Sequence, residues 1–144
     1  MKKIVVILTL MFIVLLAACG KGADENNAGD NQVMEPIDVQ LEGPEEVELN
    51  ESVTFQATVT QGEEPVDDAD EVEFEIWKNG WKDLSEMIEA THHGDGVYSI
   101  ETVFTENGVY TVQSHVTART MHSMPKQEVI AGSGERETSQ DESE

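Results

Sequence analysis

The sequence has one cysteine and only eight basic residues against 30 acidic ones. A single cysteine excludes a disulfide within the chain. The scarcity of Lys and Arg excludes nucleic acid as a partner, because binding it requires basic residues that replace its counterions. The sequence also has no convincing amphipathic helix, and residues 83–89 are expected to form at most one helical turn.

The N-terminus has the pattern of a secretory signal. Lys2 and Lys3 precede an almost continuous apolar stretch at residues 4–16, which is too short to span a bilayer comfortably. The Leu-Ala-Ala-Cys sequence that ends at Cys19 resembles the lipobox of bacterial lipoproteins. We therefore expect a signal peptide at residues 1–18, a diacylated Cys19 as the mature N-terminus, and a protein anchored by lipid to the extracytoplasmic face of the cell membrane.

Composition divides the mature protein into three parts. Residues 19–35 are rich in Gly, Ala, Asn and Asp and predict a flexible tether. Residues 132–144 are rich in Gly, Ser and Glu and predict a disordered acidic tail. Residues 36–131 remain as one domain, which is long enough for one modest core.

Alternating apolar residues between turn signals predict strands throughout that domain. The expected fold is all-β: a disulfide-free, immunoglobulin-like antiparallel sandwich of about seven strands. Tyr110, soon after the turn at Asn107-Gly108, is placed like the tyrosine corner of such sandwiches. The expected core residues are Phe55, Val59, Phe74, Ile76, Tyr98, Ile100, Tyr110 and Val112.

Two tryptophans, Trp77 and Trp81, flank the turn signal Asn79-Gly80. A two-residue turn would place Trp77 opposite Lys82, where cation–π contact and cross-strand packing would account for it. The pair could alternatively form a surface that binds a partner.

A histidine-methionine cluster is the most distinctive chemistry in the chain. Imidazole and thioether together suit copper, because soft sulfur selects Cu(I) and imidazole also suits Cu(II) and zinc. The candidate ligands are His115, His122, Met121 and Met124, completed by His92 or His93. His92 and His93 are neighbours on an expected strand, so they should point to opposite faces. The alternative is that the histidines are ordinary surface residues and the methionines fill one end of the core.

Other chemistry is weakly supported. Residues 63–70 are acidic but lack a calcium-binding pattern, so a solvated loop is the better interpretation. No glycine loop suited to phosphate and no arrangement typical of a serine nucleophile is visible. We therefore expect no enzymatic activity.

The segments His92–Tyr98, Gly108–Tyr110, His115–Arg119 and Met121–Pro125 resemble the YtkA-like domain. This domain is grouped with FixH-type proteins and occurs in lipoproteins of Bacillus-like Gram-positive bacteria. The resemblance covers about residues 36–131 and implies an immunoglobulin-like sandwich. It implies, loosely, a role in copper handling or respiratory oxidase assembly, with a copper-dependent membrane protein as a possible partner.

The sequence is consistent with two functions. The first is a lipid-anchored protein that binds copper through the histidine-methionine cluster. The second is a metal-free sandwich that recognises a protein or a cell-envelope polymer through its loops and the tryptophan pair.

We predict that Cys19→Ala releases the protein from the membrane fraction or leaves it unprocessed, because the acylated thiol is the expected anchor. Membrane fractionation and the apparent mass of the product measure this. A variant that matures and fractionates with the membrane as before would contradict the lipid anchor.

Overall fold

The computed structural model of the 144-residue chain describes residues 34–135. The expected signal peptide, Cys19 and residues 136–144 lie outside the described residues. Within residues 34–135 there is one short 3-10 helix, η1 (Lys82–Leu84), and no helix long and apolar enough to cross a membrane. The strands are β1 (Ile37–Glu42), β2 (Glu46–Val47), β3 (Ser52–Gln61), β4 (Glu64–Pro65), β5 (Glu71–Lys78), β6 (Glu86–Glu89), β7 (Thr91–Gly94), β8 (Val97–Val103), β9 (Gly108–Ala118), β10 (Met121–Ser123) and β11 (Lys126–Ala131).

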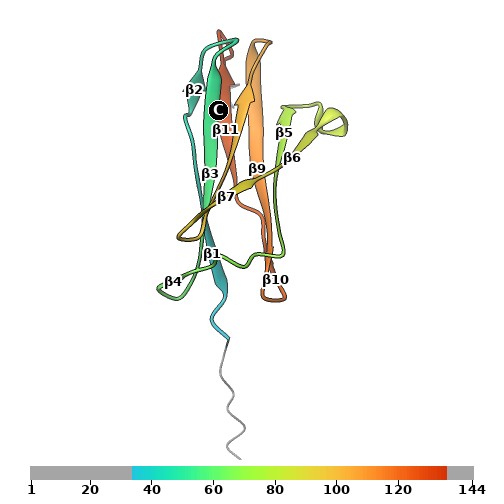
Figure 1. Cartoon of the computed structure of the whole chain (residues 1–144). Coiled ribbons are helices and arrows are strands. Elements are labelled where there is room, and N and C mark those ends of the chain that lie inside the picture. The colour runs from blue at the N-terminus through green and yellow to red at the C-terminus, as the bar shows by residue number, and fades with distance from the viewer. Residues whose placement is uncertain (1–33, 136–144) are drawn as a thin grey trace, which may run out of the picture. The chain divides into compact units, whose positions relative to one another are not determined.

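These strands form the two layers of an all-β sandwich, as the sequence predicts (Figure 1). The first sheet has the order β1-β3-β8-β7, with β4 paired to β3. The second sheet has the order β2-β11-β9-β5-β6, with β10 paired to β9. All pairs are antiparallel except β2 with β11. The chain passes from one sheet to the other between β6 and β7, so these two edge strands lie on the same side of the sandwich.

The core lies between the sheets and follows from period-two alternation. In β3, Phe55, Ala57 and Val59 are fully buried, and in β5 Phe74 is fully buried beside glutamates that point outward. Seven of the eight expected core residues are buried. The eighth, Tyr110, is half-buried and packs against the core.

Tyr110 forms the hydrogen bond expected of a tyrosine corner. Its hydroxyl donates to the backbone oxygen of Glu106, at 3.1 Å, at the start of β9. Tyr98 makes a comparable hydrogen bond: its hydroxyl donates to the backbone oxygen of Val66 at 3.0 Å. Each tyrosine therefore buries its ring and satisfies its polar end on the backbone of a loop.

The structure differs from the sequence prediction around Asn79-Gly80. The turn forms, with the Trp81 amide donating to the Lys78 oxygen at 2.8 Å and Gly80 at a φ of 86°. The pairing of β5 with β6, however, begins only at Ile76 and Glu86. The residues between them form the longer loop that contains η1. The short strand β6 was missed because four residues rich in glutamate give little periodicity.

We predict that Phe74→Ala lowers the free energy of unfolding by about 3–5 kcal/mol, because it removes a fully buried aromatic ring and leaves a cavity. Urea unfolding followed by circular dichroism measures this. The control is Met87→Ala, at a side chain that is 47% exposed, which should change stability by less than about 0.5 kcal/mol. Equal effects of the two substitutions would contradict the assigned core.

Candidate functional site

The candidate ligands that come together lie on the outer face of the second sheet, over β5, β9 and β10. In β9, Ser114, Val116 and Ala118 are buried against the core, so His115 and Thr117 point to the opposite face. The pairing of β9 with β5 places Glu73 directly across from His115 and Glu75 across from Gln113. The outer face thus carries carboxylates beside the first imidazole.

His115 is tied to β5 by a charged hydrogen bond. Its Nε2 lies 2.9 Å from Glu75 Oε2, and the side chains of the two residues are 22% and 12% exposed. Hydrogen bonds from the Ser85 hydroxyl and then from His115 lower the pKa of Glu75, although burial opposes them. Glu75 is therefore ionised at neutral pH and can only accept a hydrogen bond, so His115 Nε2 must carry the proton. Nδ1 of the neutral ring keeps its lone pair.

His122 reaches the same face through a tight hairpin between β9 and β10. Arg119 and Thr120 form its turn, both with left-handed φ values of 51° and 66°, as type I′ turns require. His122 then pairs with Thr117, and its Nδ1 is hydrogen-bonded to Thr117 Oγ1 at 2.7 Å. The rings of His115 and His122 are 6.4 Å apart between centroids.

The strand register also determines which of the two methionines lies on the same face as His115 and His122. Ser123 pairs with Val116 and Lys126 pairs with Gln113, so two residues lie between these pairs on each strand. Met124 therefore falls opposite His115, on the outer face, where it is 48% exposed. Met121 pairs with the buried Ala118 and so faces the core side. The face thus carries His115 and His122 together, and the register places Met124, but not Met121, on the same face.

His92 and His93 belong to the other sheet and do not join this group. His92, on β7, stacks on Tyr98 with centroids 4.5 Å apart, and its Nε2 lies 2.8 Å from Asp67 Oδ1. His93 Nε2 is hydrogen-bonded to Ser99 Oγ at 2.7 Å. The neighbours point to different faces, as expected from strand alternation. Since packed sheets lie about 10 Å apart, neither imidazole can complete a site on the outside of the second sheet.

Within residues 34–135, no three side chains of His, Asp or Glu are grouped in a way that could hold a metal ion. The two imidazoles over β9 and β10 therefore lack a third nitrogen or oxygen ligand. Besides the carboxylates of β5, the thioether of Met124 has ligand chemistry and lies on this face by register.

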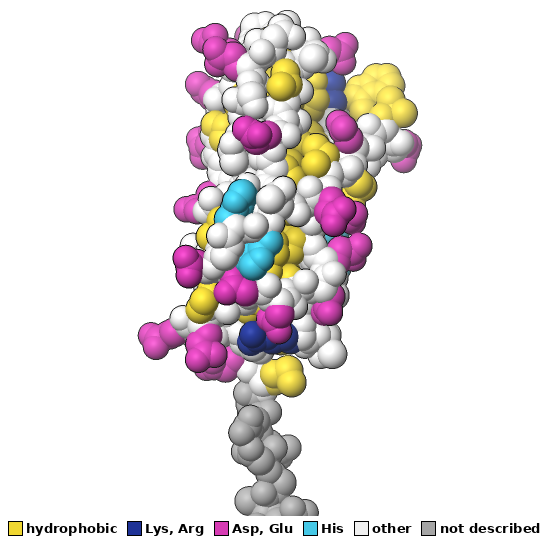
Figure 2. All heavy atoms as spheres, viewed as in Figure 1, with side chains coloured by type: hydrophobic (Ala, Val, Ile, Leu, Met, Phe, Trp, Pro, Cys, Tyr) yellow, Lys and Arg dark blue, Asp and Glu magenta, His cyan; other side chains and the backbone are white. Residues whose placement is uncertain are grey.

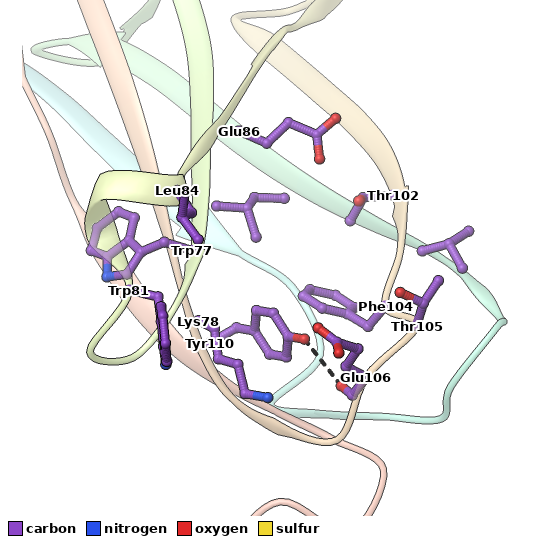
Figure 3. A pocket seen from close by; sticks show the side chains of 12 residues that line it. Trp77, Lys78, Trp81, Leu84, Glu86, Thr102, Phe104, Thr105, Glu106 and Tyr110 are labelled. Atoms are coloured by element: carbon purple, nitrogen blue, oxygen red, sulfur yellow. Dashed lines mark hydrogen bonds between the residues drawn. The ribbon is translucent and has the colours of Figure 1, made fainter.

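The tryptophan pair lies away from the histidines, at the loop between β5 and β6. Lys82 Nζ sits 4.6 Å from the ring centre of Trp77, which is the cation–π contact expected from the sequence. Trp81 is 61% exposed. Both rings line a hollow of about 500 Å³ that also includes the end of β8 (Figure 3).

Sequence reasoning missed the residues that hold the histidines in place. The alternation of Glu71, Glu73 and Glu75 was visible, but which carboxylate meets His115 depends on the register between β5 and β9. Asp67 was assigned only to a solvated loop. It accepts hydrogen bonds from the Gly96 amide at 2.7 Å and from His92, and so joins two loops.

The YtkA-like family matches residues 31–115, which is more than half of the chain. The chain belongs to the YtkA-like family. The match covers His92, His93 and His115, and it ends before the β10 hairpin that carries His122 and Met124. No curated protein matches the sequence.

Solved structures resemble this YtkA-like chain in fold. An engineered protein aligns with a TM-score of 0.52 and 17% identity, over 66% of this chain and 20% of its own. Native alpha-2-macroglobulin of E. coli aligns with a TM-score of 0.50 and 13% identity, over 67% of this chain and 10% of its own. The soluble domain of PmoD from a Methylocystis species aligns with a TM-score of 0.47 and 15% identity, over 67% and 90%. The chain thus spans a fifth or less of the first two proteins, and these likenesses concern the fold alone.

We predict that the YtkA-like domain loses stability as the pH falls through about 4.5, partly through Glu75 and Asp67. Their pKa values in the folded state are lowered from 4.5 and 3.8, Glu75 by Ser85 and His115 and Asp67 by the Gly96 amide and His92. A lowered pKa means that the unfolded chain takes up protons first, so the stabilisation is complete above the unfolded value and is lost below it. Thermal melts from pH 7 to pH 3 measure the loss.

In Glu75→Gln the decline should be shallower than in the wild type, whereas Glu48→Gln, at an exposed position, should leave it unchanged. If the two variants give the same pH profile, Glu75 does not contribute to acid sensitivity.

Proposed function

We propose that this YtkA-like domain binds one copper ion as Cu(I) through His115, His122 and Met124, and that it holds or hands over the ion rather than turning over a substrate. The observation that supports this most directly is the convergence of the two imidazoles on one accessible face, 6.4 Å apart between ring centres.

That separation is at the outer limit of the reach of two imidazoles on one ion. An imidazole nitrogen binds a metal at about 2.0–2.1 Å and lies about 1.1 Å from its ring centre, so two rings on one ion stand at most about 6.4 Å apart. The upper limit corresponds to a linear arrangement. A small rotation of either side chain would bring the rings closer and admit a third ligand.

The hydrogen bonds of the two rings leave the right atoms available. With its Nε2 proton donated to Glu75, His115 presents Nδ1. If His122 Nδ1 donates to Thr117, His122 presents Nε2. A carboxylate or hydroxyl on the second ring nitrogen is the usual support of a metal-binding histidine, because it fixes the tautomer and the orientation of the ring.

The third ligand favours copper over zinc. Zinc sites use three or four nitrogen, thiolate or oxygen ligands, and within residues 34–135 no three side chains of these kinds are grouped in a way that could hold a metal ion. The thioether of Met124, opposite His115, is a soft ligand that suits Cu(I). The large negative charge of the chain, −22 at pH 7, would attract the cation without selecting it. Met121, His92 and His93 are not part of the proposed site.

The proposal includes the anchor. Acylation of Cys19 would hold the protein at the extracytoplasmic face of the membrane, where a copper-dependent membrane protein would be its partner. The loose link of the family to copper handling and respiratory oxidase assembly is in keeping with this placement.

We predict stoichiometric Cu(I) binding that is lost when His122→Ala and Met124→Ala are combined. Titration of the purified protein against a competing Cu(I) chelator measures this. Met121→Ala is the matched control, because this methionine of β10 faces the core side, and His92→Ala is a second control on the other sheet. Both variants should bind like the wild type. Glu75→Gln should weaken binding by about 10–100-fold through the loss of support to His115.

Tight binding that survives the double substitution would show that the ion sits elsewhere. Binding weaker than micromolar in the wild type would exclude a copper function.

A further inference from the structure

A second surface lies apart from His115 and His122, at the side of the sandwich where the chain passes from β6 in one sheet to β7 in the other. The hollow of about 500 Å³ runs between the loop after β5 and the end of β8. In Figure 3, Trp77, Trp81 and Leu84 stand on one side of it, and Thr102 and Thr105 stand on the other. None of the lining residues is a proposed copper ligand. We call this hollow the side groove.

The side groove gathers exposed apolar side chains that the fold does not need. Leu84 is 74% exposed, Trp81 61% and Val103 47%, and all three line it. Figure 2 shows hydrophobic side chains projecting beside the β5–β6 connection, on a face otherwise rich in carboxylates. Large apolar residues clustered in a hollow with a polar rim are typical of an interaction site.

The floor of this region includes an unpaired strand edge. β3 pairs with β8 along its length, from Val97 to Val103. On its other side, β8 pairs with β7 only through Val97, Tyr98 and Ser99. Among the described residues, Ile100–Val103 therefore has no strand partner on that side, and Thr102 and Val103 open into the side groove. Such an edge is a template for an added strand.

Charge decides what kind of strand would be added. Glu86 and Glu106 line the side groove, and Glu89 and Glu101 line the neighbouring hollow along the same edge. Two cations lie nearby: Lys82 covers Trp77, and Lys78 lines the side groove with the end of its side chain over Gly108. A second copy of this chain would bring a charge of −22 against another −22. The C-terminal segment 135–144 is also acidic. Neither a second copy of the chain nor this segment is therefore suited to the side groove.

From these observations we infer that the side groove binds an extended, basic polypeptide segment of another protein. The segment adds as a strand beside Ile100–Val103, in the place that β7 leaves open. Its apolar side chains on one face enter between Trp81, Leu84 and Val103. Its Lys or Arg side chains on the other positions meet the glutamates of the rim.

The test uses the full chain and a synthetic probe, a seven-residue peptide that alternates lysine with valine. Two control peptides replace every lysine by glutamate, or the central valine by proline, which cannot donate to a strand ladder. Binding is measured by fluorescence anisotropy of labelled peptides at about 0.15 M salt, where the screening length is about 8 Å. Amide hydrogen exchange of the protein, with and without peptide, locates the contact.

We expect micromolar binding of the lysine–valine peptide, at least ten-fold weaker binding of both control peptides, and slowed exchange at Ile100–Val103. Trp81→Ala and Val103→Glu should weaken binding by at least ten-fold. Both residues are exposed, so the fold should tolerate the changes. Met124→Ala is the matched control, an equally exposed apolar residue on the other face, and should bind the peptide normally. It also separates this result from the copper proposal.

Three results would overturn the inference. The first is binding of the proline peptide as tight as that of the lysine–valine peptide, which would show that charge attraction accounts for binding without strand pairing. The second is slowed exchange elsewhere than on β8. The third is sedimentation of the chain as a dimer that Val103→Glu dissociates, which would assign the side groove to a second copy.

Discussion

The pairing of β9 with its neighbours is the constraint on which the rest of this domain depends. β9 is its longest strand and is bonded to β5 on one side and to β10 and β11 on the other. Val112 and Val116 are buried in the core together with their β5 partners Ile76 and Val72, so the register of these strands cannot shift by one residue without turning the buried set toward water. The same register fixes the outer face. It places His115 between Glu73 and Met124 and brings His122 beside them.

Two histidines of this acidic domain are paired with carboxylates. His92 and His115 each meet a carboxylate, Asp67 and Glu75, whose pKa is lowered in part by that contact. The two pairs have different surroundings. His92 stacks on Tyr98 and connects the loop at Asp67 to the hairpin after β7, which is a structural role. His115 lies near a second imidazole, His122, on a face where the register also places Met124, and this difference is why the copper proposal rests on the second pair.

The two proposed sites use different properties of the sandwich. The copper site uses the face of a sheet, where alternation presents a ligand from each of two strands at a fixed spacing. The side groove uses an edge, where β7 ends before β8 does and leaves backbone groups and apolar side chains together. A face binds through side chains alone, whereas an edge can also contribute backbone hydrogen bonds. The groove is therefore suited to a polypeptide and the face to an ion.

The sequence by itself determined the fold class and most of the core, because strand alternation and turn residues are local signals, and it supplied the candidate metal ligands by residue type. Phe55, Phe74 and Val112 were placed in the core from spacing alone, and the corner role of Tyr110 followed from the turn before it. Only the tertiary structure decided which candidate ligands meet. Met121 and Met124 are three residues apart and look equivalent in sequence. The register of β10 turns Met121 toward the core side, whereas Met124, which follows β10, is exposed. His92 and His115 look like parts of one cluster in the sequence, but they lie on different sheets because the chain crosses from one sheet to the other between β6 and β7. Local spacing does not predict which distant segments pair as strands.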